Sequence, residues 1–411
     1  MNAWWLSVNG LRTVTELELK QRIRSRRWIA ALVAWFLVIG GITSLVILST
    51  NNVLAIGDGS GPNPGPLAFG LNVFFVLGMG LIIAPTFTAT SINGDRSAGT
   101  LATLQATRLS AAEIALGKLL AALLTALVFL VVGLPFIAWS MVSGSISLWQ
   151  VVACFTVVFV LVAVVCAIGL GWSALLSRPA GSTVMTYLSV VALTIISTGV
   201  MGLLSPLAVS RDPVRVWGLP PGVQQTYQAE VDRYWTDNPR GDGSDAPRPP
   251  IEQCTWYDDV QQNVHTERIW WITVINPFVI VADAAPLPAG AYADLSAYAE
   301  GASDPLAWIR LGVRSMALAP QTERDDCTAL YGETDGYSIE YAADGTPRVT
   351  TSSGTPVNVD SPVKRRAVMI DSPIWPLGLG ANLLLGATFF WVAVQRLKVP
   401  YGQLAKGTRV A

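Results

Sequence analysis

Long apolar stretches without any charged residue alternate with short polar connections along this chain. An α-helix needs roughly 20 apolar residues to cross the hydrocarbon core of a bilayer, because it rises about 1.5 Å per residue and satisfies its own backbone hydrogen bonds. Six stretches meet this requirement. The pattern therefore predicts six membrane-spanning helices, at about 28–48, 67–90, 119–142, 148–176, 182–209 and 373–395.

The composition agrees with an α-helical polytopic membrane protein, since 52% of the 411 residues are hydrophobic and 13% are charged. Lys and Arg residues next to membrane spans are retained on the cytoplasmic side. Segment 1–27 carries six of them, the connection 91–118 three and the tail 396–411 four, whereas the connections 49–66 and 143–147 carry none. Both termini are therefore expected to be cytoplasmic.

Segment 210–372 differs from the rest of the chain, because it contains 23 of the 28 acidic residues and many turn-forming sequences. Long loops cross the membrane largely regardless of charge, so we expect a large extracytoplasmic domain of mixed and irregular structure between spans five and six. It should include a hairpin with its turn at Asp344 and Gly345. Cys254 and Cys327 are its only cysteines, and they would form a disulfide in an oxidising compartment. Two free buried thiols are the alternative.

A shorter apolar run, at 269–281, lies inside this segment and contains only 13 residues. It is too short to span a bilayer and is interrupted by Asn276 and Pro277. Trp270 and Trp271 are suited to the headgroup level of a membrane. The run is therefore predicted to be a re-entrant or interfacial segment.

Few residues offer catalytic or binding chemistry. The six stretches contain no Asp, Glu, Lys, Arg or His, which argues against a proton-coupled transporter or an intramembrane enzyme. The single histidine, His265, has no second His or Cys at ligand spacing, so no metal site is expected. Gly117 and Lys118 lack the earlier Gly and the following Ser or Thr of a phosphate-binding loop. We therefore expect no enzyme activity and no cofactor bound by this chain, and any energy for uphill transport must come from another polypeptide.

The connection 91–118 is the longest one expected on the cytoplasmic side, and its pattern is helical. Ser110 and Glu113 have the spacing of a capping box, which would begin a helix that continues into the third span. An ordinary amphipathic connector would show the same features. A short helix is also expected at 100–106, with Leu101 and Leu104 on one apolar face and Gly99 separating it from the preceding residues.

This connection resembles the loop between the second and third spans in the permease subunits of type-2 ATP-binding-cassette (ABC) exporters. In that family the loop typically has an acidic-basic opening, GTLE, a leucine pair, a TP turn, S-R-x-E and GK. Here Ala102 replaces the glutamate and Arg108 replaces the proline. The resemblance is carried by Asp95-Arg96-x-x-Gly99-Thr100-Leu101-x-x-Leu104 and Ser110-x-x-Glu113-Ile114-x-x-Gly117-Lys118.

The resemblance implies a permease that exports a hydrophobic or amphiphilic substrate, such as a drug, lipid or peptide. It would pair with itself or with another permease and bind two ATPase subunits, which would hold ATP and Mg; no nucleic acid is implied. Segment 1–27 would be an interfacial helix in contact with membrane lipid. The residues that would couple to the ATPase are Asp95, Arg96, Gly99, Thr100, Leu101, Leu104, Arg108, Ser110, Glu113, Gly117 and Lys118.

Two other kinds of protein fit the same patterns. One is a permease-like scaffold that uses ATP hydrolysis to regulate an extracytoplasmic partner, which the size of 210–372 suggests. The other is an ATP-independent membrane receptor or assembly protein. Arg outnumbers Lys 22 to 5, a bias typical of GC-rich bacterial genomes, so the expected location is a bacterial plasma membrane.

Overall fold

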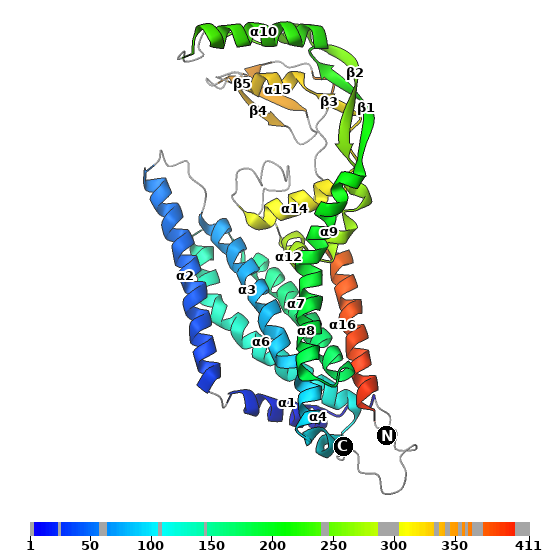
Figure 1. The fold of residues 1–411 in the computed structure, drawn as a ribbon. Helices are drawn as coiled ribbons and strands as arrows, with labels where there is room; N and C mark the ends of the chain where they lie inside the picture. The colour runs from blue at the N-terminus through cyan, green and yellow to red at the C-terminus, as the bar shows by residue number, and fades with distance from the viewer. Residues whose placement is uncertain are drawn as a thin grey trace.

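A computed structural model of the chain defines its fold (Figure 1). The structure describes residues 4–23, 26–56, 64–105, 109–143, 146–239, 246–286, 304–332, 337–341, 346–351, 356–357, 361–363 and 373–398.

Within these residues, six helical segments are long and apolar enough to cross a membrane, as the sequence predicted. The chain is thus a helical polytopic membrane protein. The third spanning helix begins at Ala111, before the apolar stretch itself, because the capping box starts it there. The spanning segments are α2 (Arg26–Ile56), α3 (Pro64–Thr88), α6 (Ala111–Val142), α7 (Leu148–Leu175), the continuous run α8 (Pro179–Val191), η1 (Ala192–Ile196), α9 (Ser197–Leu204) and η2 (Ser205–Ala208), and α16 (Trp375–Leu397).

The helices pack around α7, whose buried face contacts α3, α6, α8 and α16. Polar side chains form hydrogen bonds between helices inside the apolar bundle. Thr43 of α2 donates to Asn72 of α3 at 2.9 Å, and Asn72 donates to Ser140 of α6 at 3.3 Å. Because lipid offers no hydrogen-bond partner, such pairs fix the relative positions of neighbouring spans. The spanning segments α2 and 179–208 are the least buried of the six.

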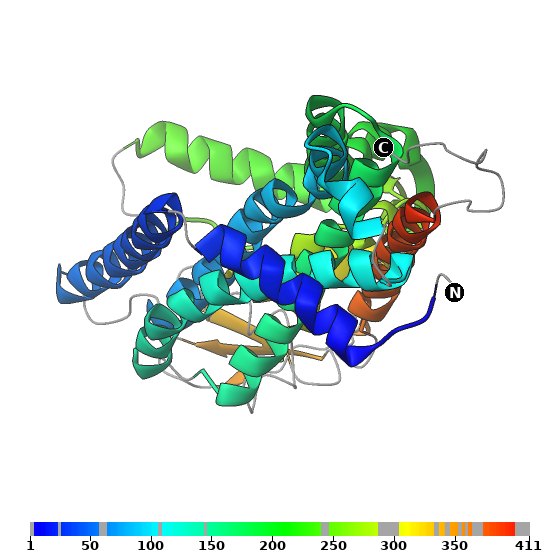
Figure 2. The same ribbon diagram turned by 90° about the horizontal axis from the view of Figure 1, so that it is seen from below.

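One end of the bundle, which we call the α1 end, carries three short elements. The helix α1 (Val8–Ile23) lies across this end, as Figures 1 and 2 show. The helices α4 (Ser91–Ser97) and α5 (Thr100–Gln105) lie beside it, between α3 and α6 in the chain. The C-terminal residue of α16 also lies at this end.

At the opposite end, which we call the β1 end, the chain leaves the bundle as a two-stranded ribbon (Figure 1). Strand β1 (Val209–Gly218) follows η2 directly and pairs antiparallel with β2 (Thr255–Val264). The short β3 (Glu323–Asp325) runs parallel to β1. The exposed helix α10 (Pro221–Asp237) lies at the tip of the ribbon, and η3 (Ile251–Gln253) follows it.

A second sheet has the order β4 (Tyr337–Tyr341), β5 (Pro347–Thr351) and β6 (Pro356–Val357), with antiparallel pairing. Strands β4 and β5 are those of the predicted hairpin, whose turn residues lie outside the described residues. The helix α15 (Cys327–Gly332) adjoins this sheet. Cys254 and Cys327 form the disulfide that the sequence suggested, with their Cα atoms 6.2 Å apart.

The apolar run 269–281 forms two short helices, α11 (Trp271–Val274) and α12 (Pro277–Ala284), after η4 (Thr266–Arg268). The run is absent from the helices long enough to span. Asn276 ends the first helix and caps the second by accepting from Phe278 N at 2.9 Å, with Pro277 in the first turn. The helix α14 (Pro305–Met316) packs on α12 at the β1 end.

A π-helical turn, η1, explains how α11 and α12 attach to the bundle. Asn276 Nδ2 donates to the carbonyl of Thr194 within this turn at 2.8 Å and to Thr198 Oγ1 at 3.0 Å. On the other side, Asn382 of α16 donates to Ile275 O at 2.9 Å. The residues between α11 and α12 are therefore hydrogen-bonded to both the fifth and the sixth spanning segments.

Candidate functional site

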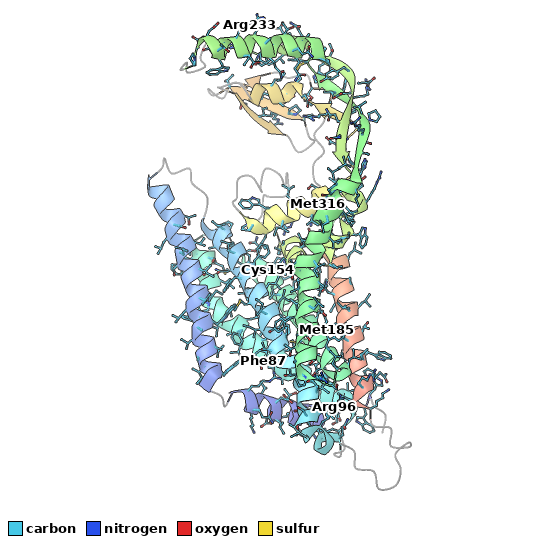
Figure 3. The ribbon with its side chains drawn as sticks, viewed as in Figure 1. Phe87, Arg96, Cys154, Met185, Arg233 and Met316 are labelled. Carbon is cyan, nitrogen blue, oxygen red and sulfur yellow. A yellow bond between two sulfur atoms is a disulfide. The ribbon has the colours of Figure 1, made fainter. Side chains whose placement is uncertain are left out.

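The connection 91–118 presents an exposed tip at the α1 end of the bundle. Residues 96–100 are all exposed, and Figure 3 shows Arg96 at this end. Gly99 has φ +70°, the left-handed conformation that lets the chain turn from α4 into α5. The tip therefore combines a fixed turn with an accessible cation, which suits contact with another protein. Arg108, another predicted coupling residue, lies outside the described residues.

Leu101 and Leu104, two of the predicted coupling residues, pack against the helices of this chain. The Leu101 side chain is 5% exposed, and Leu104 packs against the same cluster. Because apolar surface gains free energy by leaving water, the face found in the sequence lies on the nearest apolar surface, that of the bundle itself. The cluster that they join contains Ile92, Ala111, Ala112, Ile114, Ala115, Leu170, Ala174, Ala393, Val394 and Leu397.

The start of α4 is capped from another spanning helix. Ser173 of α7 accepts from the backbone N–H groups of Ile92 at 2.9 Å and Asn93 at 3.2 Å. The first N–H groups of a helix lack partners within it, so this hydroxyl stabilises α4 in place. Asn93 also donates to Ser182 Oγ at the start of α8 at 2.7 Å. The connection is therefore hydrogen-bonded to the end of α7 and the start of α8.

The end of α5 reaches the last spanning helix. Gln105 Nε2 donates to the carbonyl of Leu397, at the C-terminus of α16, at 3.2 Å. This bond satisfies one of the carbonyls that a helix C-terminus leaves without an internal partner.

The predicted capping box is present at the start of α6. Ser110 Oγ accepts from Glu113 N at 3.0 Å, and Glu113 Oε2 accepts from Ser110 N at 2.7 Å. The second carboxylate oxygen, Oε1, accepts from the N–H and the hydroxyl of Ser7 at 2.7 and 2.6 Å. One buried carboxylate thus caps α6 and fixes the entry to α1.

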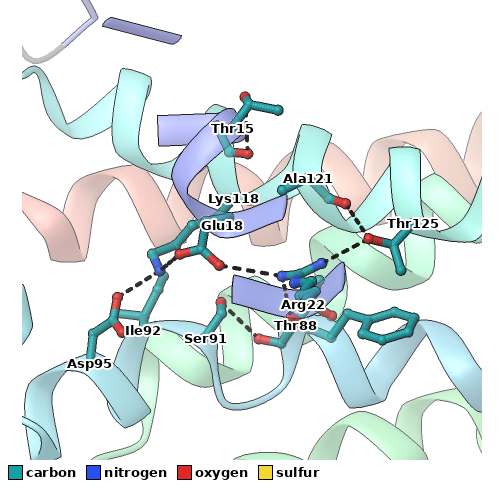
Figure 4. Close-up of polar contacts among 12 residues, drawn as sticks. Thr15, Glu18, Arg22, Thr88, Ser91, Ile92, Asp95, Lys118, Ala121 and Thr125 are labelled. Atoms are coloured by element: carbon teal, nitrogen blue, oxygen red, sulfur yellow. Dashed lines mark hydrogen bonds and ion pairs between the residues drawn. The ribbon is translucent and has the colours of Figure 1, made fainter. Parts of the chain in front are cut away.

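An ion-pair network joins α1, α4 and α6 (Figure 4). Lys118 Nζ lies 2.5 Å from Glu18 Oε1 and 2.6 Å from Asp95 Oδ2, and the Lys118 side chain is 1% exposed. Glu18 Oε2 lies 3.5 Å from Arg22 Nη2. A buried ammonium requires counter-ions, and Glu18 and Asp95 supply them. Lys118, one of the predicted coupling residues, is buried within this chain, whereas the Asp95 side chain remains 29% exposed.

Gly117 allows α1 to cross α6 closely. A Cβ atom at this position would lie 2.6 Å from Val14 Cγ1. Thr15 Oγ1 also approaches the carbonyl of Gly117 at 3.4 Å. The Gly117-Lys118 pair is therefore a packing and ion-pair site between two helices.

Of the predicted coupling residues, the structure brings Asp95, Ser110, Glu113, Gly117 and Lys118 into one internal contact region and leaves Arg96, Gly99 and Thr100 at the surface. Sequence reasoning missed Ser7, Glu18, Asn93, Ser173 and Gln105. Only Glu18 carried a signal, because it stands four residues before Arg22 on α1.

A second buried ion pair, also missed, lies at the β1 end. Asp283 of α12 has Oδ1 2.6 Å from Arg314 Nε of α14, and both side chains are buried. Its Oδ2 accepts from Ile374 N at 2.7 Å and Trp375 N at 2.8 Å. The carboxylate therefore neutralises the positive N-terminus of α16 and joins α12, α14 and the sixth span.

His265 lies at the base of the β1–β2 ribbon between two carboxylates. Its Nδ1 is 2.6 Å from Glu267 Oε1, and its Nε2 is 2.9 Å from Asp212 Oδ2 and 2.7 Å from Ser210 Oγ. The hydrogen bond with Glu267, supported by Asp212, raises the pKa of His265. The hydrogen bond from Ser210, with a smaller contribution from His265, lowers the pKa of Asp212. Among the described residues, no group of three or more His, Cys, Asp or Glu side chains is arranged to hold a metal ion.

Neither a protein-family model nor a curated protein matches this chain. The fold alone therefore defines its class, that of helical polytopic membrane proteins.

Proposed function

We propose that this chain is the membrane-spanning permease subunit of a type-2 ABC exporter, which moves a hydrophobic or amphiphilic substrate out of the cell. Two separate ATPase subunits, with their ATP and Mg, would supply the energy. The proposal rests on one observation: the exposed tip at 96–100 belongs to a connection that is bonded to α1, α6, α7 and α16.

These bonds connect the tip to three helices of the bundle. The Asp95–Lys118–Glu18 ion pairs lead to α1, the Ser173 cap leads to α7, and Gln105 leads to α16. Packed and hydrogen-bonded elements move as units, so a displacement of the tip by an ATPase would shift several spans together.

The proposed topology has the α1 end in the cytoplasm and segment 210–372 outside a bacterial plasma membrane. The basic residues of 1–27, 91–118 and 396–411 support this orientation. The Cys254–Cys327 disulfide supports an oxidising compartment for the β1 end.

The second permease, of the same or another sequence, would pack against the fifth spanning segment. Its exposed face carries Leu188, Ile195 and Leu203. Gly199 and Gly202 have open space where a Cβ would lie, which permits close approach of another helix. The substrate path would run between the two permeases. The six apolar stretches bring no charged side chain to such a path, which favours a hydrophobic or amphiphilic substrate.

Co-purification tests the proposal. The chain is co-expressed with candidate ATPases that contain a phosphate-binding loop, and captured ATPase is measured for wild type and for Arg96→Glu. We expect at least a fivefold loss of capture in Arg96→Glu. The matched control is Arg233→Glu, an exposed arginine on α10 at the other end of the molecule (Figure 3). Equal capture by the wild type and both variants would contradict the proposal.

The permease-like scaffold is a second candidate, favoured by one observation. The fifth spanning segment continues into β1 without a linker, since η2 ends at Ala208 and β1 begins at Val209. A movement of this span would therefore reach the outer segment directly. A flexible Gly-Ser insertion between Ala208 and Val209 separates the candidates. Loss of an external activity with intact efflux supports the scaffold, whereas intact external activity with impaired efflux supports the exporter.

A further inference from the structure

A cavity of about 520 Å³ lies near the α1 end, between α1, α2, α3 and α6. Its walls are apolar and largely aromatic, from Trp28, Trp35, Met79, Ile83, Phe87 and Phe129. Among the side chains that the structure describes, Arg22 is the only charged one that lines it. Ala31, Ala34 and Val38 of α2 are exposed and line its open side. Its volume is within the range of roughly 300–1,000 Å³ that is common for ligand sites.

The length of the cavity corresponds to one leaflet of a membrane. Its lining residues on α2 extend from Trp28 to Val38, which is about 15 Å along a helix that rises 1.5 Å per residue. The hydrocarbon core of a bilayer is about 30 Å thick, so the cavity spans about half of it. Because α2 is a membrane-spanning helix, the open side would face lipid. A chain-shaped, apolar ligand from the surrounding leaflet fits these dimensions.

Arg22 provides a cationic end to this apolar space. Its guanidinium donates through Nη1 to Thr125 Oγ1 at 3.4 Å and through Nη2 to Phe87 O at 3.2 Å. Glu18, its ion-pair partner at 3.5 Å, is closer to Lys118, at 2.5 Å. Among the described residues, no acceptor is bonded to Arg22 Nε. The guanidinium thus retains donor capacity for an anion.

The surrounding sequence also favours an anion. Segment 1–27 contains six basic and two acidic residues, and three further arginines follow Arg22 within five positions. Basic segments next to a membrane attract anionic lipids. A phosphate group would pair with the charge of Arg22 at one end of the cavity, and an acyl chain would pack against Trp28 and Trp35.

We propose that this cavity binds one acyl chain of an anionic phospholipid, whose phosphate contacts Arg22. The lipid belongs to the leaflet at the α1 end and fills the space between α2 and α3. It thereby fastens α2 to the rest of the bundle. This binding needs no ATPase and is independent of the exporter proposal.

Photolabelling tests the site in the purified full-length chain. The protein is placed in lipid nanodiscs that contain phosphatidylglycerol with a diazirine on its acyl chain, or phosphatidylcholine with the same group. Labelled peptides are mapped by mass spectrometry after illumination. We expect phosphatidylglycerol to label 79–87 of α3 at least fivefold more than phosphatidylcholine does. Equal labelling by the two lipids would overturn the proposal.

Two variants separate the cavity from the membrane surface. Ala34→Trp fills the open side and should lower labelling of 79–87 at least fivefold, whereas Ala30→Trp, on an exposed part of α2 outside the cavity, should not. Arg22→Gln should remove the preference for phosphatidylglycerol. Size-exclusion profiles show which variants remain folded, and each of the two cavity variants tests the site by itself. Unchanged labelling in a folded Ala34→Trp, or an unchanged preference in a folded Arg22→Gln, would also overturn the proposal.

Discussion

Lys118 shows how much of the α1 end depends on a single side chain. Its ammonium is almost fully buried and lies between carboxylates from two other helices. The cost of removing this charge from water is offset only while both carboxylates remain, so α1 and α4 are held together by one cation.

We predict that Lys118→Met destabilises the protein by about 3–5 kcal/mol, because it leaves Asp95 without its cation and Glu18 with only the more distant Arg22. Chemical unfolding in detergent measures the change. Lys20→Ala is the matched control, since Lys20 forms an exposed pair with Glu16 and should leave stability unchanged. Equal effects of the two substitutions would contradict the buried network.

His265 gives a pH-dependent prediction. Its folded pKa is raised above the unfolded value of 6.5, so the stability that it contributes is present below pH 6.5 and is lost as pH rises through the folded pKa. Because the chain contains one histidine, its imidazole NMR signals report this pKa directly. We expect a midpoint above 6.5 that falls in Glu267→Gln. A wild-type midpoint at or below 6.5 would contradict the arrangement with Asp212 and Glu267.

Residue-level prediction from the sequence succeeded where the partners are close in the chain. Ser110 and Glu113 are three positions apart, so their capping box was visible in the sequence. Ser7 completes the same site from more than 100 positions away, and no local pattern indicates that contact. For the same reason Glu18 and Asp95 were not recognised as the partners of Lys118.

At the scale of elements, α5 has an apolar face that the sequence pattern revealed, but the pattern did not identify the helices that cover it. The spacing of Leu101 and Leu104 reveals an apolar side, but it does not say what covers that side. The bundle covers it, because residues of α6, α7 and α16 form the apolar cluster that these two side chains join.

We therefore predict that Leu101→Asp loosens the connection itself. A buried carboxylate without a partner is costly, so amide hydrogen exchange across 91–105 should rise at least tenfold. Ser97→Asp, at the exposed tip, should leave exchange within twofold of wild type. Unchanged exchange in Leu101→Asp would show that α5 does not pack on the bundle.

The attachment of α11 to α16 provides another test at this scale. A Cβ atom at Gly378 would lie 2.0 Å from the carbonyl oxygen of Val274, whereas one at Gly380 would have no neighbour within 4 Å. We expect Gly378→Ala to destabilise the protein by about 1–3 kcal/mol or more, because the backbone must shift. Gly380→Ala should be neutral or slightly stabilising in the same thermal unfolding assay. Similar melting temperatures for the two variants would contradict this packing.

At the scale of the whole molecule, the two ends of the bundle differ in their contacts. The α1 end gathers its polar contacts around one connection and leaves a tip exposed. The β1 end joins α12, α14 and α16 through Asp283 and continues into the ribbon of β1 and β2. Composition and span length predicted the six helices. They did not predict the hydrogen bonds and ion pairs between helices, because those contacts depend on which helices become neighbours.

The central claim is that the tip at 96–100 binds a separate ATPase. Site-specific photo-crosslinking tests it most directly, with p-benzoylphenylalanine placed at Ser97 or, as a control, at Arg233 on α10. Illumination of cells that express each variant is followed by mass spectrometry of the adducts. We predict that position 97 crosslinks to a protein with a phosphate-binding loop and that position 233 does not. The absence of an adduct from position 97, or an adduct only to proteins without such a loop, would contradict the claim.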